Sequence, residues 1–227
     1  MFFDPVYFIF IAPALILAFY AQMRLRSTYA TASQMPAPLT GAAAARHVLD
    51  TAGLNQVGIE QIGGHLSDHY DPRDKVLRLS PEVYGGRSLA AVGIAAHEAG
   101  HAIQDATNYA PLVVRNAAVP IAGFGSSASI WMLIAGFILQ FQPLILLGIG
   151  LFACVVAFQL VNLPVEFNAS SRAKEQLLSL GIITADDRVY VNKVLNAAAL
   201  TYVAATLQAV LTLLYYIMRF AGGSNRE

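Results

Sequence analysis

The stretch that decides the fold of this chain is AAHEAGHAIQ, at residues 95–104. It contains the pattern H-E-x-x-H, formed by His97, Glu98 and His101. Positions four apart on a helix lie on one face, about one turn apart, so both imidazoles can bind one metal ion. Zinc accepts histidine nitrogens at roughly 2.0–2.1 Å, and Glu98 can take a proton from a water on that ion. The pattern predicts a catalytic zinc site with Glu98 as general base; the alternative is two core histidines on a packed helix.

The residues around this motif favour a helix over Ser88–Asp105. No proline occurs from Ser88 to Gln104, and the Ser88 side chain can cap the start of the helix. Ala90, Gly93 and Gln104 share the face of the histidines. The two small residues on that face leave room for a metal ion and a substrate.

The composition is that of a membrane protein with one small polar domain. The chain has 227 residues, of which 56% are hydrophobic and only 12% charged, about half the charged fraction of a soluble domain. The net charge is zero, so no basic surface indicates nucleic-acid binding. The single cysteine, Cys154, lies in an apolar run, which excludes an intrachain disulfide and a cysteine-based zinc site.

Apolar segments of nearly the length of a bilayer span, about 20 residues, occur in the sequence. These predicted spans are Val6–Met23, Val119–Leu139, Leu144–Leu163 and Ala197–Met218. A cleaved signal peptide is the alternative for the first, but the preceding MFFD has no positive charge. The fourth is more polar and could instead be a buried helix of the polar domain. We therefore predict a mainly α, polytopic membrane protein with about four transmembrane helices.

The predicted domains follow from these spans: a first transmembrane helix over 1–23, catalytic parts over 24–117 and 164–196, a transmembrane hairpin over 118–163, and a fourth helix with tail over 197–227. The catalytic parts together form a small α+β, zincin-like domain. Within the first part, Ser27–Leu39 is predicted to be a linker, and Thr40 to cap a short helix that ends at Gly53. His47 on that helix is interpreted as a surface or half-buried residue.

A short strand is predicted at Val57–Ile62 and a β-hairpin over His65–Ser80, where Asp71-Pro72-Arg73-Asp74 is a strong turn signal. His65 and His69 are also four apart, but four residues of strand span about 13 Å, so they do not easily share an ion. Structural or substrate-edge roles fit them better. In zinc peptidases an edge strand beside the catalytic helix binds substrate by strand addition, and this hairpin is the candidate.

The distribution of lysine and arginine predicts the topology. The 24–117 segment holds eight of the fourteen basic residues, the 166–196 segment holds four, and Arg219 and Arg226 are the remaining two. Cytoplasmic segments carry the excess of basic residues, which favours both catalytic parts in the cytoplasm and both termini outside.

A catalytic zinc usually has three protein ligands and one water. Glu166 follows the third span directly, and the transmembrane hairpin returns it to the side of the membrane that holds His97. A carboxylate so close to a span is costly unless it is paired or binds a metal. Glu166 is therefore the predicted third ligand, with a plain interfacial acid as the alternative. Glu175, in a charge-rich stretch, and Asp105, one turn beyond His101, are weaker candidates.

Four stretches together resemble the YugP-type neutral zinc metallopeptidases of bacterial membranes, which are similar to gluzincins. They are AAHEAGHAIQ, the upstream LSDHYDPRDKVLRLS and VYGGRSLAAVGIAAHE, and the downstream LPVEFNASSRA. The resemblance covers nearly the whole chain. It implies that His97 and His101 are zinc ligands, that Glu98 is the catalytic base, and that Glu166 completes the site. Asn168 stands where similar sequences often have Asp. Asn168 or Ser170 is therefore the candidate to hydrogen-bond the ring nitrogens of the histidines that do not bind the metal.

The predicted activity is hydrolysis of peptide bonds by a membrane-embedded endopeptidase with one Zn²⁺ per chain, located in the bacterial inner membrane. Candidate oxyanion or substrate contacts are His69, Tyr70, Tyr84 and Tyr202. A site at the membrane surface favours membrane proteins or membrane-proximal segments as substrates, with the lipid bilayer as the surrounding partner. The alternatives are a non-catalytic scaffold or client-binding protein with a structural zinc, and a transporter, although the spans lack the embedded charges of a transport path.

Overall fold

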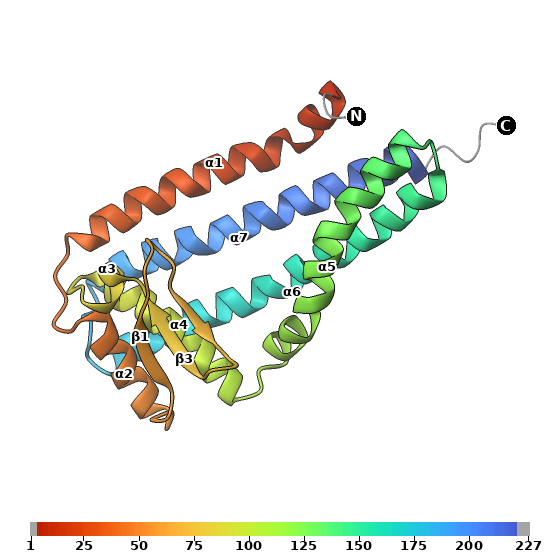
Figure 1. Cartoon of the computed structure of the whole chain (residues 1–227). Helices are drawn as coiled ribbons and strands as arrows, with labels where there is room; N and C mark the ends of the chain where they lie inside the picture. The colour runs from red at the N-terminus through yellow and green to blue at the C-terminus, as the bar shows by residue number, and fades with distance from the viewer. Residues whose placement is uncertain (1–3, 222–227) are drawn as a thin grey trace. The chain divides into compact units, whose positions relative to one another are not determined.

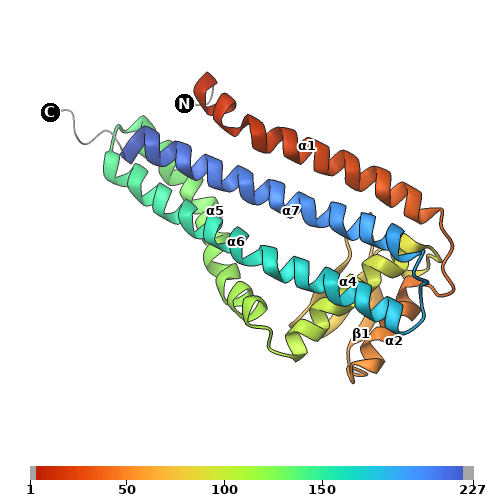
Figure 2. The same ribbon diagram turned by 180° about the vertical axis from the view of Figure 1, so that it is seen from behind.

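The structure, a computed structural model, describes residues 4–221. In chain order its elements are α1 (Pro5–Ser33), α2 (Gly41–Thr51), β1 (Gly58–Gln61), β2 (His69–Asp71), β3 (Val76–Leu79), α3 (Pro81–Tyr84), α4 (Leu89–Ala106), α5 (Ala110–Ile138), α6 (Gln142–Ser179), α7 (Arg188–Tyr216) and the π-helical turn η1 (Ile217–Ala221). Figures 1 and 2 show them from opposite sides. Arg226, used above to predict the topology, lies outside the described residues, as do the ends of the predicted segments 1–23 and 197–227.

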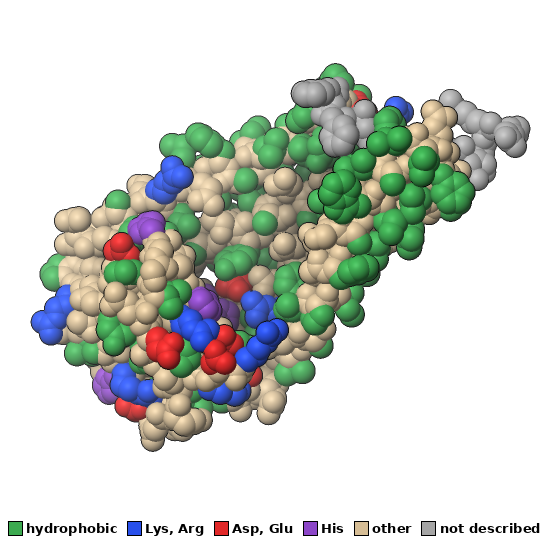
Figure 3. All heavy atoms as spheres, in the orientation of Figure 1, with side chains coloured by type: hydrophobic (Ala, Val, Ile, Leu, Met, Phe, Trp, Pro, Cys, Tyr) green, Lys and Arg blue, Asp and Glu red, His purple; other side chains and the backbone are tan. Residues whose placement is uncertain are grey.

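The prediction of a mainly α, polytopic membrane protein is confirmed. Helices α1, α5, α6 and α7 are long and apolar enough to cross a membrane, and the most apolar windows of α1 and α6 have mean hydropathies of 2.0 and 2.7. Hydrophobic side chains are spread along these helices in Figure 3, and most of the visible charged side chains lie over the sheet.

The linker predicted at Ser27–Leu39 is wrong for its first part, because α1 continues to Ser33. The hydroxyl groups of Thr28 and Thr31 donate hydrogen bonds to carbonyl oxygens four residues earlier, so these polar residues are accommodated inside the helix. Similarly, α6 does not end at the predicted membrane exit. It passes Pro164, which removes one backbone hydrogen bond without ending the helix.

The chain divides into two compact units. The helical unit comprises residues 1–20, 114–163 and 201–227, and the mixed unit comprises residues 21–113 and 164–200. In the helical unit, α5 and α6 lie side by side in both views (Figures 1 and 2). A Cβ on Gly148 would lie 2.9 Å from the Leu133 side chain, so the glycine permits this close contact. At the other end of the sequence, the Tyr215 hydroxyl donates a hydrogen bond to Asp4, which directly precedes α1.

The mixed unit contains a three-stranded sheet of order β1-β3-β2. Strand β1 pairs with β3 in parallel, and β2 pairs with β3 in antiparallel orientation, so β2 is an edge strand. The predicted hairpin is confirmed: the Asp71 carboxylate accepts hydrogen bonds from the backbone N–H groups of Arg73 and Asp74, which is the turn chemistry expected of aspartate. Strands β2 and β3 both contact α4.

The core of the mixed unit joins the sheet to α2, α3, α4 and the adjoining parts of α6 and α7. Its largest fully buried side chains include Leu49, Leu77, Leu79, Leu89, Leu177 and Val191. Thr40 caps α2 as predicted, because its side chain accepts a hydrogen bond from the backbone N–H of Ala43. This core holds α4 between the sheet and the C-terminal part of α6.

Candidate metal centre

Helix α4 presents His97, Glu98 and His101 from a buried, small-residue surface. It starts where the Ser88 side chain accepts a hydrogen bond from the N–H of Ala91, as the sequence predicts. Most residues of α4 are buried, and many of them are alanine or glycine. The rings of His97 and His101 lie edge to face, with centroids 4.8 Å apart. One turn of helix therefore brings two imidazoles together, as the spacing predicts.

Glu166 on α6 meets these two rings. Its Oε2 lies 3.3 Å from Nε2 of His97 and 3.7 Å from Nε2 of His101. Two ligand atoms about 2.1 Å from a tetrahedral ion lie about 3.4 Å from each other, so these separations fit a shared zinc ion. The three ligand atoms all lie within 4.8 Å of one another. The structure thus brings together the three residues that the sequence selects as ligands.

The burial of Glu166 also fits a metal. The residue is only 4% exposed, and within residues 4–221 its Oε2 has no hydrogen-bond partner. A buried carboxylate oxygen without a partner is costly, and a divalent cation between the carboxylate and the two imidazoles would remove that cost. The donor set of two histidines and one glutamate is one that catalytic zinc sites use.

A glycine allows the two ligand-bearing helices to approach each other. A Cβ on Gly100 would lie 2.8 Å from the backbone oxygen of Ala169, closer than real Cβ contacts. Gly100 directly precedes His101, and Ala169 follows Glu166 by three residues. Any larger residue at position 100 would push α6 away from the histidines.

The second nitrogen of each imidazole has its own partner. Nδ1 of His97 lies 3.1 Å from the Ser170 hydroxyl, and Nδ1 of His101 lies 3.0 Å from Oε1 of Gln104. Asn168, the other predicted supporting residue, contacts Gln104 instead of a histidine. Sequence reasoning did not identify Gln104 in this role, although its position three residues after His101 on the same helix face was an available signal.

Glu98 is a buried acid next to the two histidines on α4. It is 8% exposed, and no hydrogen bond or ion pair involves its carboxylate in the part of the chain that the structure describes. It follows His97 directly on α4. A buried acid without a structural partner, beside a candidate metal site, is a feature that functional sites often have.

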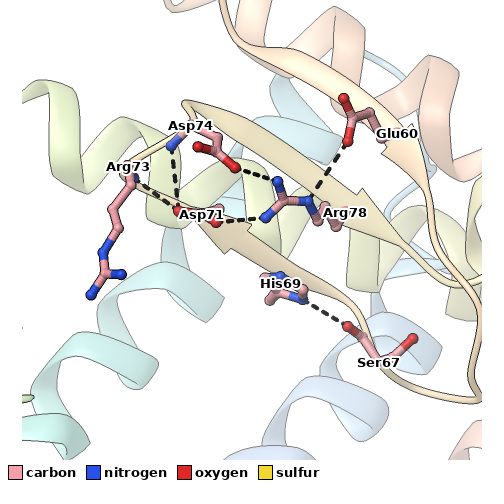
Figure 4. A network of polar contacts seen from close by, with 7 residues as sticks. All are labelled: Glu60, Ser67, His69, Asp71, Arg73, Asp74 and Arg78. Carbon is pink, nitrogen blue, oxygen red and sulfur yellow. Dashed lines mark hydrogen bonds and ion pairs between the residues drawn. The ribbon is translucent and has the colours of Figure 1, made fainter.

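The four residues predicted to contact the oxyanion or the substrate lie in different parts of the structure. The Tyr70 hydroxyl donates a hydrogen bond to Asp105 at 2.9 Å, and burial together with this bond raises the pKa of Tyr70 well above its usual range. His69 Nδ1 contacts the backbone oxygen of Ser67 (Figure 4). Tyr84 is partly buried against the core of the mixed unit, and Tyr202 belongs to the helical unit. Tyr70 and His69 are thus engaged with groups other than the three ligands.

The weaker ligand candidates are also occupied elsewhere. Asp105 accepts hydrogen bonds from Tyr70 and Lys75, which link the hairpin to the end of α4. Glu175 is exposed on α6. His65 is 61% exposed and lies 4.0 Å from Glu82. Among residues 4–221, the set of His97, His101 and Glu166 is the only one with metal-binding geometry.

The hairpin beside this centre is held by one arginine. Arg78 pairs with Asp71, Asp74 and Glu60, whose side chains point toward it in Figure 4. The backbone N–H of Arg73 and the Arg78 side chain lower the pKa of Asp71. The side chain of Arg73 points away from this group. These ion pairs hold the edge strand β2 and the turn that follows it against β3.

Two comparisons with known proteins give matches over nearly the whole chain. A family model described as "Putative neutral zinc metallopeptidase" matches residues 7–221, a range that includes all of α4 and α6. The protein named "Putative membrane protease YugP" of Bacillus subtilis (strain 168) is 47% identical over 223 residues, which covers 97% of this chain and 99% of that protein. No solved structure matches the chain.

Proposed function

Because the chain belongs to the neutral zinc metallopeptidase family, as its motifs predict, we propose that it is a gluzincin-like membrane endopeptidase with one zinc ion per chain. His97, His101 and Glu166 would hold the ion. The observation that carries this proposal is the convergence of two Nε2 atoms on one buried carboxylate oxygen, at 3.3 and 3.7 Å.

The reaction assigned to this site is hydrolysis of a peptide bond. When bound, zinc supplies a Lewis acid that polarises the scissile carbonyl and lowers the pKa of water. Glu98 takes the proton of the attacking water and delivers it to the leaving amine. This role requires that the carboxylate is not held in structural hydrogen bonds. The Gln104 amide oxygen contacts Nδ1 of His101 and the Ser170 hydroxyl contacts Nδ1 of His97, so both Nε2 atoms would be left for the ion.

The proposed place for the substrate is the free edge of β2. This strand is antiparallel to β3 and is linked to α4 through the bond between Tyr70 and Asp105. An extended peptide can add to such an edge with main-chain hydrogen bonds. The edge therefore would set the scissile bond beside the helix that carries Glu98.

We further propose that the enzyme lies in the bacterial inner membrane with its catalytic parts in the cytoplasm, and that it cleaves membrane proteins or membrane-proximal segments. The excess of lysine and arginine in 24–117 and 166–196 supports this orientation. Glu166 lies on the same helix as the most apolar of the candidate spans, which supports a site near the membrane surface. If this is right, a membrane-tethered peptide is cleaved faster than its soluble version, and equal rates would contradict it.

The test of catalysis compares wild type with Glu98→Gln in detergent-purified full-length protein. We expect Glu98→Gln to keep its zinc but to cleave unfolded casein at least about 100-fold more slowly, since loss of a general base costs about 10²–10⁴ in rate. Glu175→Gln, at an exposed position of α6, is the matched control and should cleave normally. Cleavage by Glu98→Gln at the wild-type rate would place the base elsewhere. Zinc-loaded wild type that cleaves neither casein nor tethered peptide would identify a scaffold with a structural zinc.

A further inference from the structure

Behind His101 lies a chain of hydrogen bonds that runs from α4 to α6. Gln104 Oε1 is 3.0 Å from Nδ1 of His101, and Gln104 Nε2 donates to the backbone oxygen of Val165 at 2.8 Å and to Oδ1 of Asn168 at 3.0 Å. Asn168 Oδ1 also accepts a hydrogen bond from Nε of Arg172 at 2.8 Å. Gln104 is completely buried. A buried amide with every polar atom paired is strongly fixed in place.

The direction of each bond in this chain is determined. Arginine only donates, so the atom of Asn168 that faces Arg172 must be its oxygen. That oxygen and the carbonyl of Val165 only accept, so the atom of Gln104 that faces them must be its NH₂ group. The oxygen of Gln104 is then left for His101, and the proton between them belongs to Nδ1 of the imidazole. In the neutral imidazole, Nε2 of His101 then carries the lone pair, which is the form that a metal requires.

The same glutamine also connects the two helices that supply the ligands. Val165, whose carbonyl accepts the bond from Gln104, immediately precedes Glu166 and is fully buried. A displacement of α6 relative to α4 would therefore break this bond and move Glu166 together with it. One side chain thus acts on both the orientation of His101 and the position of the third ligand.

We infer that Gln104 is a positioning residue of the zinc site and that Arg172, through Asn168, sets the orientation of its amide. This inference rests on the zinc site proposed above. Partners of metal-bound histidines typically contribute 10- to 100-fold to metal affinity. The asymmetry between the histidines follows: His97 has only the hydroxyl of Ser170, which can both donate and accept, whereas His101 has an acceptor whose direction is fixed.

The test measures zinc affinity of the full-length protein in detergent by competition with a chelator. We expect Gln104→Met, which keeps the volume but removes the polar atoms, to bind zinc about 10- to 100-fold more weakly. Asn168→Leu should also weaken binding, whereas Asn168→Asp keeps an acceptor for both donors and should bind at least about tenfold more tightly than Asn168→Leu. The Nδ1 proton of His101, shielded by Gln104, should give a slowly exchanging ¹H–¹⁵N NMR signal in zinc-loaded wild type that Gln104→Met loses.

Replacement of two basic residues of α6, one at a time, distinguishes an effect on the zinc site from a general loss of stability. Arg172 and Lys174 each donate to an asparagine oxygen, but the Lys174 bond goes to Asn196 on α7 and the Arg172 bond to Asn168, the partner of Gln104. Arg172→Met should weaken zinc binding and Lys174→Met should not. Should Gln104→Met fail to fold, the comparison of Arg172→Met with Lys174→Met and of the two Asn168 variants still decides.

The outcomes distinguish the inference from the proposed function. Wild-type zinc affinity in Gln104→Met, or equal affinities of Asn168→Leu and Asn168→Asp, would overturn the positioning role while leaving the zinc site intact. Loss of zinc in Glu166→Ala together with unchanged affinity in Gln104→Met would have the same meaning. Absence of zinc from wild type would instead overturn the proposed site, and with it this inference.

Discussion

Replacement of Gly100 by alanine tests whether the close approach of α4 and α6 builds the metal centre. The added Cβ would lie 2.8 Å from the carbonyl oxygen of Ala169, and ordinary contact begins at 3.4 Å. The helices would have to separate by about 0.6 Å at this point to relieve the overlap. The contact joins a Cβ atom to a backbone oxygen, so no flexible side chain can rotate away and the helices themselves must move.

A shift of this size is large for a metal site. Ligand distances are held to within about 0.2 Å in functional sites, and Glu166 is one turn from Ala169 on the same helix. We therefore expect Gly100→Ala to bind zinc at least about tenfold more weakly, which corresponds to about 1.4 kcal/mol. Overpacking of the helix contact should also lower the stability of the zinc-free protein by about 1–3 kcal/mol.

The assay is zinc competition combined with thermal unfolding of the zinc-free protein, both in detergent. Gly93→Ala is the matched control on the same helix. Contrary to the expectation that Gly93 leaves room beside the histidines, it packs against Val191, and the atoms nearest to its added Cβ belong to that side chain, at 3.2 Å, which can rotate. The control should keep near-wild-type affinity. Gly100→Ala with the affinity and unfolding temperature of wild type would refute the reasoning that the Gly100–Ala169 contact positions the ligands.

Other consequences of the structure can be measured in the same preparations. Tyr70→Phe removes the bond to Asp105 and should lower stability by about 1–2 kcal/mol with less than about tenfold loss of kcat; a loss of 10²–10³ would make Tyr70 an oxyanion donor instead. The pKa of Asp71 is lowered by the Arg73 N–H and by Arg78, so its contribution to stability is complete above about pH 4 and is lost as the pH falls through the lowered pKa. Arg78→Met should flatten this acid dependence of the unfolding temperature, whereas Arg73→Met, which keeps its backbone donor, should not; equal curves for both variants would contradict the role of Arg78.

Several features of the site follow from local sequence. The spacing of His97 and His101 places them on one helix face, Ser88 caps that helix, and Asp71 makes the turn of the hairpin, because each depends on residues within four positions. Glu166 could be predicted because an acid next to an apolar span is costly without a partner. The length of a strand was the reason to separate His65 from His69; the structure places His69 in β2 with Nδ1 turned toward Ser67, whereas His65 precedes that strand.

The connections between α4 and α6 could not be predicted in this way. The bond from Gln104 to Val165 joins residues 61 positions apart, and it depends on the helix approach that Gly100 permits. Sequence pattern gives the face of a helix but not the depth or register at which two helices meet. The continuation of α1 to Ser33 was missed for another reason: Gln34, Pro36 and Pro38 indicate a linker, but they begin only after Ser33, and the hydroxyls of Thr28 and Thr31 bond within the helix.

The most direct test of the account is the amount of zinc bound per chain in detergent-purified wild type, Glu166→Ala and Glu175→Ala, measured by elemental analysis. Glu175 is the matched control, since it is an exposed glutamate on the same helix. The account predicts about one zinc per chain in wild type and in Glu175→Ala, and a clear loss in Glu166→Ala. Full retention of zinc by Glu166→Ala would contradict the site formed by His97, His101 and Glu166.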